Sequence, residues 1–407
     1  MPIIYHEFDP DGDLLLLLGR PTKTTLEHVQ PTGGIDPELA MSAYEQAIEG
    51  GTGVTIDLTM DIDDDSNEAS EEEDEGTSEP VSTEEPVQEM HMLVSSKHLM
   101  TASPVFKAML KKGHFKEGTK LTSGRSEVAL DDDPPAAFKI LMDILHFNAR
   151  QVPRELDLKK FTNLAVLVDK YQLLEPVELF AARWLKDLQD TPSIFMSDTH
   201  RILCIAWVFR SVAHELLLKI IKILLVYNEG KIGAGIAHQF PIPGLLLETI
   251  ESYRQEFISE ALRNVDDLIT KYVQRSPNGP IVCRGKYKDD TTKRRQTCDN
   301  AMSGSLMASL IFEELFPLPI APYHDLSVFD TISKVVKIKL SAVCDLWDNP
   351  EETWTDGKGP KSSGHGHMKK IKGAIDLLKA RVDGTDILEV TALMSSPSSA
   401  LHSTRTY

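Results

Sequence analysis

The twenty residues from His91 to Leu110 constrain the fold of this chain most, because they change from a strand pattern to a helical pattern. The alternating apolar run from His91 to Val94 predicts a short strand. Ser103 followed by Pro104 predicts a helix start, since serine caps helix N-termini and proline is favoured at the first helical position. Four apolar residues then follow at helical spacing, and we expect them in the core: Val105, Phe106, Met109 and Leu110. A strand that leads directly into helices predicts an α+β domain.

Neighbouring segments predict further strands and helices around this one. The run GDLLLLLG at 12–19 is continuously apolar and bounded by glycines, as expected of a strand buried on both faces. Residues 126–130 predict another short strand. Three helix starts are expected, at Asp133-Pro134, Asp157 and Pro176. A long apolar helix is expected from Ile202 to Tyr227, and its charged residues are too dense for a membrane span.

The charge of the chain is concentrated in one segment. The formal net charge is −19, but residues 57–89 hold fifteen Asp or Glu and no Lys or Arg. Without that segment, 47 acidic residues face 43 basic ones, so the rest of the chain has no basic bias that would suggest nucleic-acid binding. Few apolar residues and uniform charge cannot offset the entropy of ordering, so we expect 57–89 to be largely disordered.

The cysteine content and the start of the chain bound its environment. Four cysteines in 407 residues do not form a disulfide scaffold, and the first residues show no secretory signal. We therefore expect an intracellular protein of the cytoplasm, the nucleus or both, with no membrane association. Phosphate-loop, dinucleotide, nucleophile-elbow and H-E-x-x-H motifs are all missing from the sequence, so we expect no enzymatic activity.

The ordered part of the first half resembles a known domain. The segments that carry the resemblance are DPDGDLLLLLG, HMLVSSKHLMTASPVFKAMLKKGHFKEG, VALDDDPPAAFKILMDILH and LAVLVDKYQLLEPVELFAARWL. Together they resemble the BTB (POZ) domain, most closely the form found in many fungal proteins. The resemblance implies a small sheet with a helical layer, formed by residues 10–19 plus 87–190. Residues 20–86 are then a long insertion, 191–394 a mostly α-helical region and 395–407 a disordered tail.

The BTB resemblance also implies a function, because such domains are protein–protein interaction modules. They associate with themselves or with other proteins, and one large subset docks a cullin scaffold of ubiquitin ligases. In that subset a hydrophobic residue and a glutamate two positions later contact the cullin, and Phe115 and Glu117 hold these places here. The alternative is that Phe115 packs on its own domain and Glu117 is solvated, which chance occurrence of so short a pattern favours.

A second candidate partner site lies before the acidic segment. VTIDLTMDIDDD, at 54–65, resembles the SUMO-interacting motif, an apolar strand flanked by carboxylates that adds to the edge of a partner's sheet. The residues that would make these contacts are Val54, Ile56, Leu58, Asp61 and Asp63. The alternative is that the run is an extra strand of the protein's own sheet, or has no role.

Three cysteines and one histidine of the second half are candidate metal ligands: Cys283, Cys298, Cys344 and His365, with His367 as the alternative histidine. Thiolate and imidazole are the ligands that zinc prefers. Strong zinc motifs pair their ligands two to four residues apart, whereas 14 and 45 residues separate these cysteines. The wide spacing favours a second interpretation, in which the cysteines are small buried apolar side chains and the histidine loop is exposed. We therefore expect no cofactor, with a structural zinc ion as the alternative.

The sequence thus predicts a BTB-type adaptor or scaffold that binds other proteins, with substrate recruitment to a cullin ubiquitin ligase as its first possible role. The alternative is a non-degradative scaffold of nuclear or transcriptional complexes, binding SUMO or a basic partner through the acidic insertion.

Overall fold

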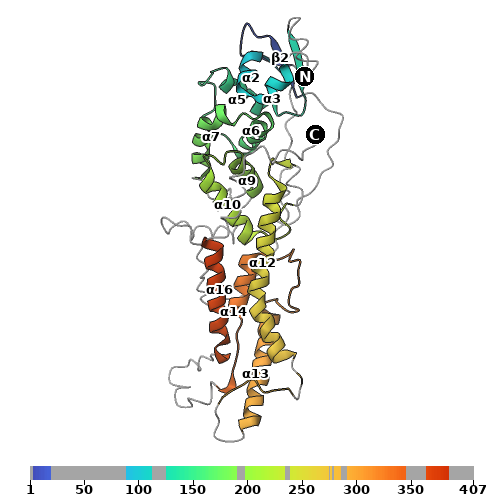
Figure 1. The fold of residues 1–407 in the computed structure, drawn as a ribbon, viewed down its shortest axis with the longest axis vertical. Helices are drawn as coiled ribbons and strands as arrows, with labels where there is room; N and C mark the ends of the chain where they lie inside the picture. The colour runs from blue at the N-terminus through green and yellow to red at the C-terminus, as the bar shows by residue number, and fades with distance from the viewer. Residues whose placement is uncertain are drawn as a thin grey trace, which may run out of the picture. The chain divides into compact units, whose positions relative to one another are not determined.

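The computed structural model describes residues 3–19, 89–111, 125–189, 198–233, 239–274, 276, 279–285, 291–344 and 364–384. Within these ranges the protein is mixed α+β, with a small four-stranded sheet and mainly helices elsewhere. Figure 1 draws these strands and helices along the chain. The expected α+β class is therefore confirmed. Contacts divide the chain into two compact units, which we call unit 1 (described residues up to Leu217) and unit 2 (those from Leu218 onward). The segments expected to be disordered, 57–89 and 395–407, lie outside the described residues except for Glu89.

Unit 1 contains the mixed sheet. Its strands are β1 (Ile4–Glu7), β2 (Leu14–Leu18), β3 (Met90–Val94) and β4 (Ser126–Leu130), in the spatial order β1-β3-β2-β4. β2 pairs antiparallel with β3 and parallel with β4, while β1 pairs parallel with β3. β2, β3 and β4 were predicted from the sequence, but β1 was not, because its four residues are too few for a clear alternation and lie at an edge.

The leucine run is buried because β2 lies between two other strands. Leu14, Leu16 and Leu18 have no exposed surface, and Leu17 on the opposite face is 4 % exposed. A strand covered on both faces needs this continuous apolar composition. Gly12, just before it, is required by a close approach, since a Cβ there would lie 2.9 Å from the Val94 carbonyl oxygen.

The change from strand to helix is stabilised by side chains at two helix starts. Helix α2 (Ser96–Ala102) follows β3, and the Asp13 carboxylate accepts hydrogen bonds from the Ser96 backbone N–H (2.8 Å) and hydroxyl (2.7 Å). Helix α3 (Pro104–Leu110) begins as predicted, with the Ser103 hydroxyl accepting from the Phe106 N–H at 3.0 Å.

The core prediction for α3 is half right. Phe106 and Leu110 are buried, at 0 % and 3 % exposed. Val105 and Met109 are only partly covered, because their side of the helix faces a groove rather than the core.

Four further helices lie wholly within the described residues of unit 1: α5 (Pro135–Leu145), α6 (Leu158–Tyr171), α7 (Leu174–Gln189) and α9 (Thr199–Val208). Asp157 caps α6 as predicted, accepting from the Lys160 N–H at 2.7 Å. Asp133 does not cap α5. Its buried carboxylate instead accepts hydrogen bonds from the Tyr171 hydroxyl and, at 2.6 Å, from the Lys170 ammonium group.

The single apolar helix expected at 202–227 is wrong in its continuity. The chain forms α9 and then α10 (His214–Tyr227), separated by a turn at residues 209–213. Helical periodicity continues across this turn, so the pattern alone does not reveal the break. Ser211 in the turn donates a hydrogen bond to the Glu178 carboxylate of α7.

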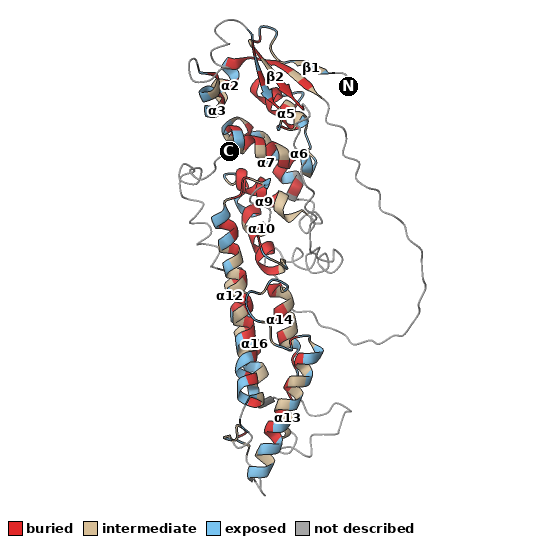
Figure 2. Cartoon of the chain, turned by 90° about the vertical axis from the view of Figure 1, so that its right-hand side faces the viewer, coloured by how far each residue is buried: buried red, intermediate tan, exposed pale blue. Residues whose placement is uncertain are grey.

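The described part of unit 2 is mainly helical. It contains the part of α10 that follows Leu217, then α12 (Gly244–Leu268), the π-helical turn η2 (Ile269–Val273), α13 (Thr291–Phe312), α14 (Val328–Lys337), the 3-10 turn η3 (Gly364–Gly366) and α16 (His367–Gly384). Helices α12, α14 and α16 contact one another, and the buried residues of α12 form a stripe along its length (Figure 2). Arg254 lies within this stripe with no exposed surface.

Helix α13 has a much narrower apolar side. Its fully buried residues recur every fourth position: Cys298, Met302, Leu306 and Leu310. One apolar residue per turn is less than the stripe of a typical core-facing helix. Asp299, beside the first of them, is also fully buried.

Candidate metal centre and apolar groove

Four side chains from separate segments of unit 2 meet in one cluster: Cys283, Cys298, Cys344 and His365. Their ligand atoms all lie within 4.8 Å of one another. Cys298 belongs to α13 and His365 to η3, while Cys283 follows η2 and Cys344 follows α14. The three cysteines are buried, as the apolar interpretation expected, but that interpretation did not expect their sulfur atoms to converge on a histidine.

The closest contacts centre on one imidazole nitrogen. His365 Nε2 lies 3.0 Å from Cys344 Sγ and 3.3 Å from Cys298 Sγ, and the two sulfur atoms are 3.6 Å apart. None of the chain's four cysteines, all of which the structure describes, is in a disulfide. Burial raises the pKa of the Cys298 thiol, so without a cation this thiol keeps its proton at neutral pH.

Backbone hydrogen bonds hold Cys283 in place. The Asp299 carboxylate accepts from the backbone N–H groups of Val282 and Cys283, each at 2.8 Å. The Gly285 N–H donates to the Cys283 sulfur at 3.4 Å. The Arg295 Nε donates to the Gly285 carbonyl at 2.8 Å, so α13 fixes the loop at two points.

His365 is oriented by a tyrosine. Its backbone is left-handed, with φ 58°, and the following Gly366 also has a positive φ of 74°. The Tyr272 hydroxyl of η2 lies 3.1 Å from His365 Nδ1 and 3.0 Å from His367 Nε2. A hydroxyl has one proton, so it donates to one ring while accepting from the other. Burial, Lys271 and His365 lower the pKa of His367 to about 4, so its ring is neutral at pH 7. Nε2 of His367 can then accept the hydrogen bond from the Tyr272 hydroxyl.

The structure therefore selects His365 rather than His367 from the two histidines in the sequence. Asp299 and Tyr272 were not predicted from the sequence. The position of Asp299 next to Cys298 was a clue to the first, whereas nothing near Tyr272 in the chain marks it. Cys204, expected in the core, is fully buried in α9 of unit 1.

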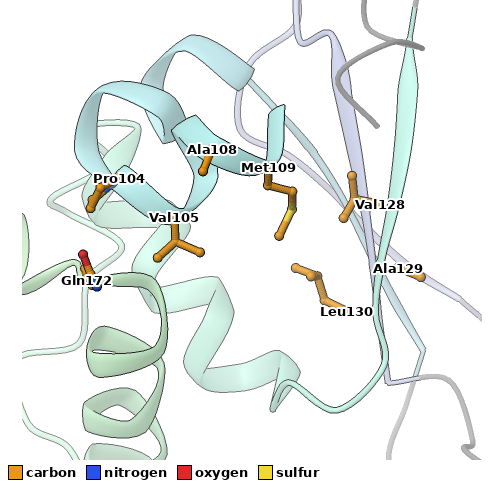
Figure 3. A pocket seen from close by; sticks show the side chains of 8 residues that line it. All are labelled: Pro104, Val105, Ala108, Met109, Val128, Ala129, Leu130 and Gln172. Carbon is orange, nitrogen blue, oxygen red and sulfur yellow. The ribbon is translucent and has the colours of Figure 1, made fainter. Parts of the chain in front are cut away.

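A second site is an apolar groove of unit 1 with a volume of about 570 Å³. It lies between α3 and β4, and Figure 3 shows Met109 and Leu130 pointing toward each other across it. The residues that line it are Pro104, Val105, Ala108, Met109, Val128, Ala129, Leu130 and Gln172. Except for Gln172, all of these residues are apolar. Lys107 of α3 and Lys111, which follows this helix, are both exposed.

The remaining sequence-predicted sites lie outside the described residues. These are the cullin-type pair, Phe115 and Glu117, and the SUMO-type motif with Val54, Ile56, Leu58, Asp61 and Asp63. Both stay predictions.

The chain was compared with protein-family models, curated proteins and solved structures. No family model, no curated protein and no solved structure matches the chain. Among the helices that the structure describes, none has the length and apolar character needed to cross a membrane.

Proposed function

We propose that the chain is a protein–protein interaction adaptor or scaffold, with unit 1 as a BTB-type recruiting module. Two observations support this proposal. The elements β2, β3, α2, α3, β4, α5, α6 and α7 follow one another in the order that the BTB resemblance implies. The groove beside α3 then offers a surface on which a partner can dock.

The partly exposed apolar side of α3 is the observation that carries the proposal. Val105 and Met109 occupy helix positions that would normally be buried, yet they face the groove. Exposed apolar surface gathered in one concave place marks interaction sites. Lys107 on α3 and Lys111 just after it are exposed, so the expected partner presents an apolar segment flanked by acidic residues.

Affinity purification of the tagged full-length chain, with mass spectrometry of the co-purifying proteins, tests this proposal. We compare wild type with Val105→Glu, which places a charge in the groove. Leu179→Glu is the matched control, because Leu179 is 86 % exposed on α7 outside the groove. Circular dichroism verifies that both variants remain folded.

The expected result is a set of partners retained by Leu179→Glu and lost with Val105→Glu. The strongest partner, purified and titrated against each variant, should bind at least about tenfold more weakly to Val105→Glu, as expected when a charge is buried in an apolar contact. Partners that are unchanged in both variants would contradict docking in the groove.

A Glu117→Lys variant separates the two roles. A cullin that is captured by wild type and lost with this variant assigns the chain to ubiquitin-ligase adaptors. A partner set without any cullin assigns it to non-degradative scaffolds. If wild type captures no specific partner, the interaction function itself is wrong.

A further inference from the structure

We propose that Cys283, Cys298, Cys344 and His365 bind one zinc ion, which joins four segments of unit 2 that are distant in the sequence. The inference does not depend on the function of unit 1. Three observations support it: the four ligand atoms converge, their chemistry suits zinc, and neighbouring groups orient them. In addition, α13 buries only one apolar residue per turn, so apolar packing alone holds this helix weakly.

The distances agree with a tetrahedral site. Zinc bonds of about 2.3 Å to sulfur and 2.0–2.1 Å to nitrogen place sulfur atoms about 3.8 Å apart, and sulfur and nitrogen about 3.5 Å apart. The sulfur atoms of Cys298 and Cys344 are 3.6 Å apart, and His365 Nε2 lies 3.0 and 3.3 Å from them. With all four ligand atoms within 4.8 Å of one another, movements of a few tenths of an ångström to about 1 Å complete the coordination sphere.

The donor set favours zinc over magnesium or calcium, and the sulfur atoms do not have disulfide geometry. Three thiolates with one imidazole, arranged tetrahedrally, are typical of structural zinc sites, whereas magnesium and calcium require oxygen ligands. A disulfide needs sulfur atoms about 2.05 Å apart, far less than the 3.6 Å between Cys298 and Cys344. A disulfide between these two cysteines would also not explain why Cys283 and His365 converge on the same point.

The groups around the four ligands have the roles expected of a second layer. Zinc-binding histidines usually hydrogen-bond through their other nitrogen, which fixes the ring orientation. His365 Nδ1 has such a bond with the Tyr272 hydroxyl, leaving Nε2 directed at the sulfur atoms. The Gly285 N–H that donates to Cys283 Sγ would stabilise its thiolate form.

Charge and coordination number indicate a structural role. Zn²⁺ replaces the protons of the three thiols, which pass to solvent, and the resulting centre has a net charge of −1. The Lys271 ammonium group lies 3.5 Å from Nε2 of His367, two residues after the histidine ligand. Four protein ligands leave no open position for water or substrate, so the ion stabilises the unit rather than performing catalysis.

Metal analysis of the full-length chain, purified with a reductant and without added metal, is the direct test. We expect one zinc per chain, measured by inductively coupled plasma mass spectrometry. Replacing zinc with Co²⁺ should give the visible absorption of tetrahedral cobalt with thiolate ligands. A chain without zinc that also gives no such cobalt spectrum would overturn the proposal, as would a disulfide between Cys298 and Cys344 in the intact mass.

Variants test the individual ligands. Cys344→Ser and His365→Ala should lose the zinc, while Cys204→Ser, at a buried cysteine of unit 1, should retain one zinc per chain. His365→Cys should also retain it with an altered cobalt spectrum, so a folding failure of His365→Ala does not decide the result. Zinc retained by both Cys344→Ser and His365→Ala would contradict this ligand set.

Tyr272→Phe tests the positioning of His365. Removal of the hydroxyl should weaken zinc affinity by about 10–100-fold without changing the stoichiometry at saturating metal. Lys293→Ala, at an exposed residue of α13, is the control and should leave the affinity unchanged. Equal affinities for Tyr272→Phe and wild type would show that the tyrosine does not position the ligand.

Discussion

The two units of this protein are stabilised in different ways. In unit 1 a leucine-rich strand lies at the centre of a sheet, and aromatic residues from three helices pack together, with Phe106 stacked on Tyr171 at 4.5 Å between ring centroids. In unit 2 helix α13 has a narrow apolar side, and buried polar groups join the helices, from Arg254 in α12 to the cysteine cluster. Apolar burial tolerates small changes in geometry, whereas polar and metal contacts depend on every partner being present. We therefore expect the loss of a single polar partner or of the metal to destabilise unit 2 more than a comparable change destabilises unit 1.

The largest effect should come from removing the metal that we propose. Structural zinc sites contribute on the order of 10 kcal/mol of binding free energy, which is then lost from unit 2. Hydrogen exchange after treatment with a chelator should accelerate in α13 and η2 and remain unchanged in β2 and α6. Equal acceleration in both units would show that they do not differ in this way.

Loss of Arg254 should be the next largest effect. Its guanidinium donates to both oxygens of Glu251, at 2.8 and 3.0 Å, and also to the Leu326 carbonyl. Arg254→Met leaves a carboxylate with little exposed surface and without its cation, which costs about 3–5 kcal/mol. Urea unfolding measures this loss, and the double variant Arg254→Met with Glu251→Leu should recover part of it.

The same ion pair should make unit 2 sensitive to acid. Burial alone would raise the pKa of Glu251, but hydrogen bonds from Arg254, the Ile232 N–H and Gln255 outweigh it and lower the pKa. The resulting stability is complete above about pH 4.5, the usual pKa, and is lost as pH falls toward the lowered folded value. Unfolding midpoints between pH 6 and pH 3 should fall more steeply in wild type than in the double variant.

Phe106→Ala tests unit 1 in the corresponding way. The ring is fully buried against Tyr171, so truncation should cost about 3 kcal/mol of unfolding free energy. Phe106→Leu retains most of the volume and should cost about half as much. A cost below about 1 kcal/mol for Phe106→Ala would show that apolar packing does not dominate unit 1.

The smallest effect is the acid response of unit 1 at His146. Its Nε2 accepts from the Ser95 N–H at 3.1 Å, so the ring is neutral, with Nδ1 donating to the Met142 carbonyl. Burial lowers its pKa, and this outweighs the hydrogen bond to the Met142 carbonyl, which raises it; His98 lowers the pKa further, while Asp9 and Asp143 raise it. Stability is therefore complete above about pH 6.5 and declines as pH falls toward the lowered folded pKa, by at most about 1.4 kcal/mol per pH unit.

Urea midpoints of wild type and His146→Gln, measured from pH 7.5 to 5, isolate this contribution. The amide does not titrate, so the variant should show a shallower decline. Identical slopes of urea midpoint against pH for wild type and His146→Gln would show that His146 does not cause the loss of stability in acid.

Local patterns predicted those parts of the fold that depend on adjacent residues. The leucine strand, the Ser103-Pro104 helix start and the Asp157 cap each follow from a few neighbouring side chains, and the structure contains all three. The turn between α9 and α10 was missed because apolar periodicity continues across it. Asp133 was misassigned because its partners, Lys170 and Tyr171, come from a helix much later in the chain.

The cysteine cluster shows the same limit for a functional site. Its residue types were identified from the sequence, but their spacing argued against a common site. Only the packing of η2, α13, α14 and η3 brings the four side chains together, and packing cannot be deduced from spacing alone. The position of Tyr272 beside His365, 93 residues apart in the chain, depends on the same tertiary arrangement.

The order of these four side chains along the chain has a consequence for biosynthesis. His365 is made 82 residues after Cys283. At about 5–20 residues per second, the first thiol leaves the ribosome about 4–16 seconds before the histidine that completes the set. During that interval the incomplete thiol set is exposed to oxidants and to competing metals, so the yield of correctly loaded protein should depend on the redox state of the cell during translation.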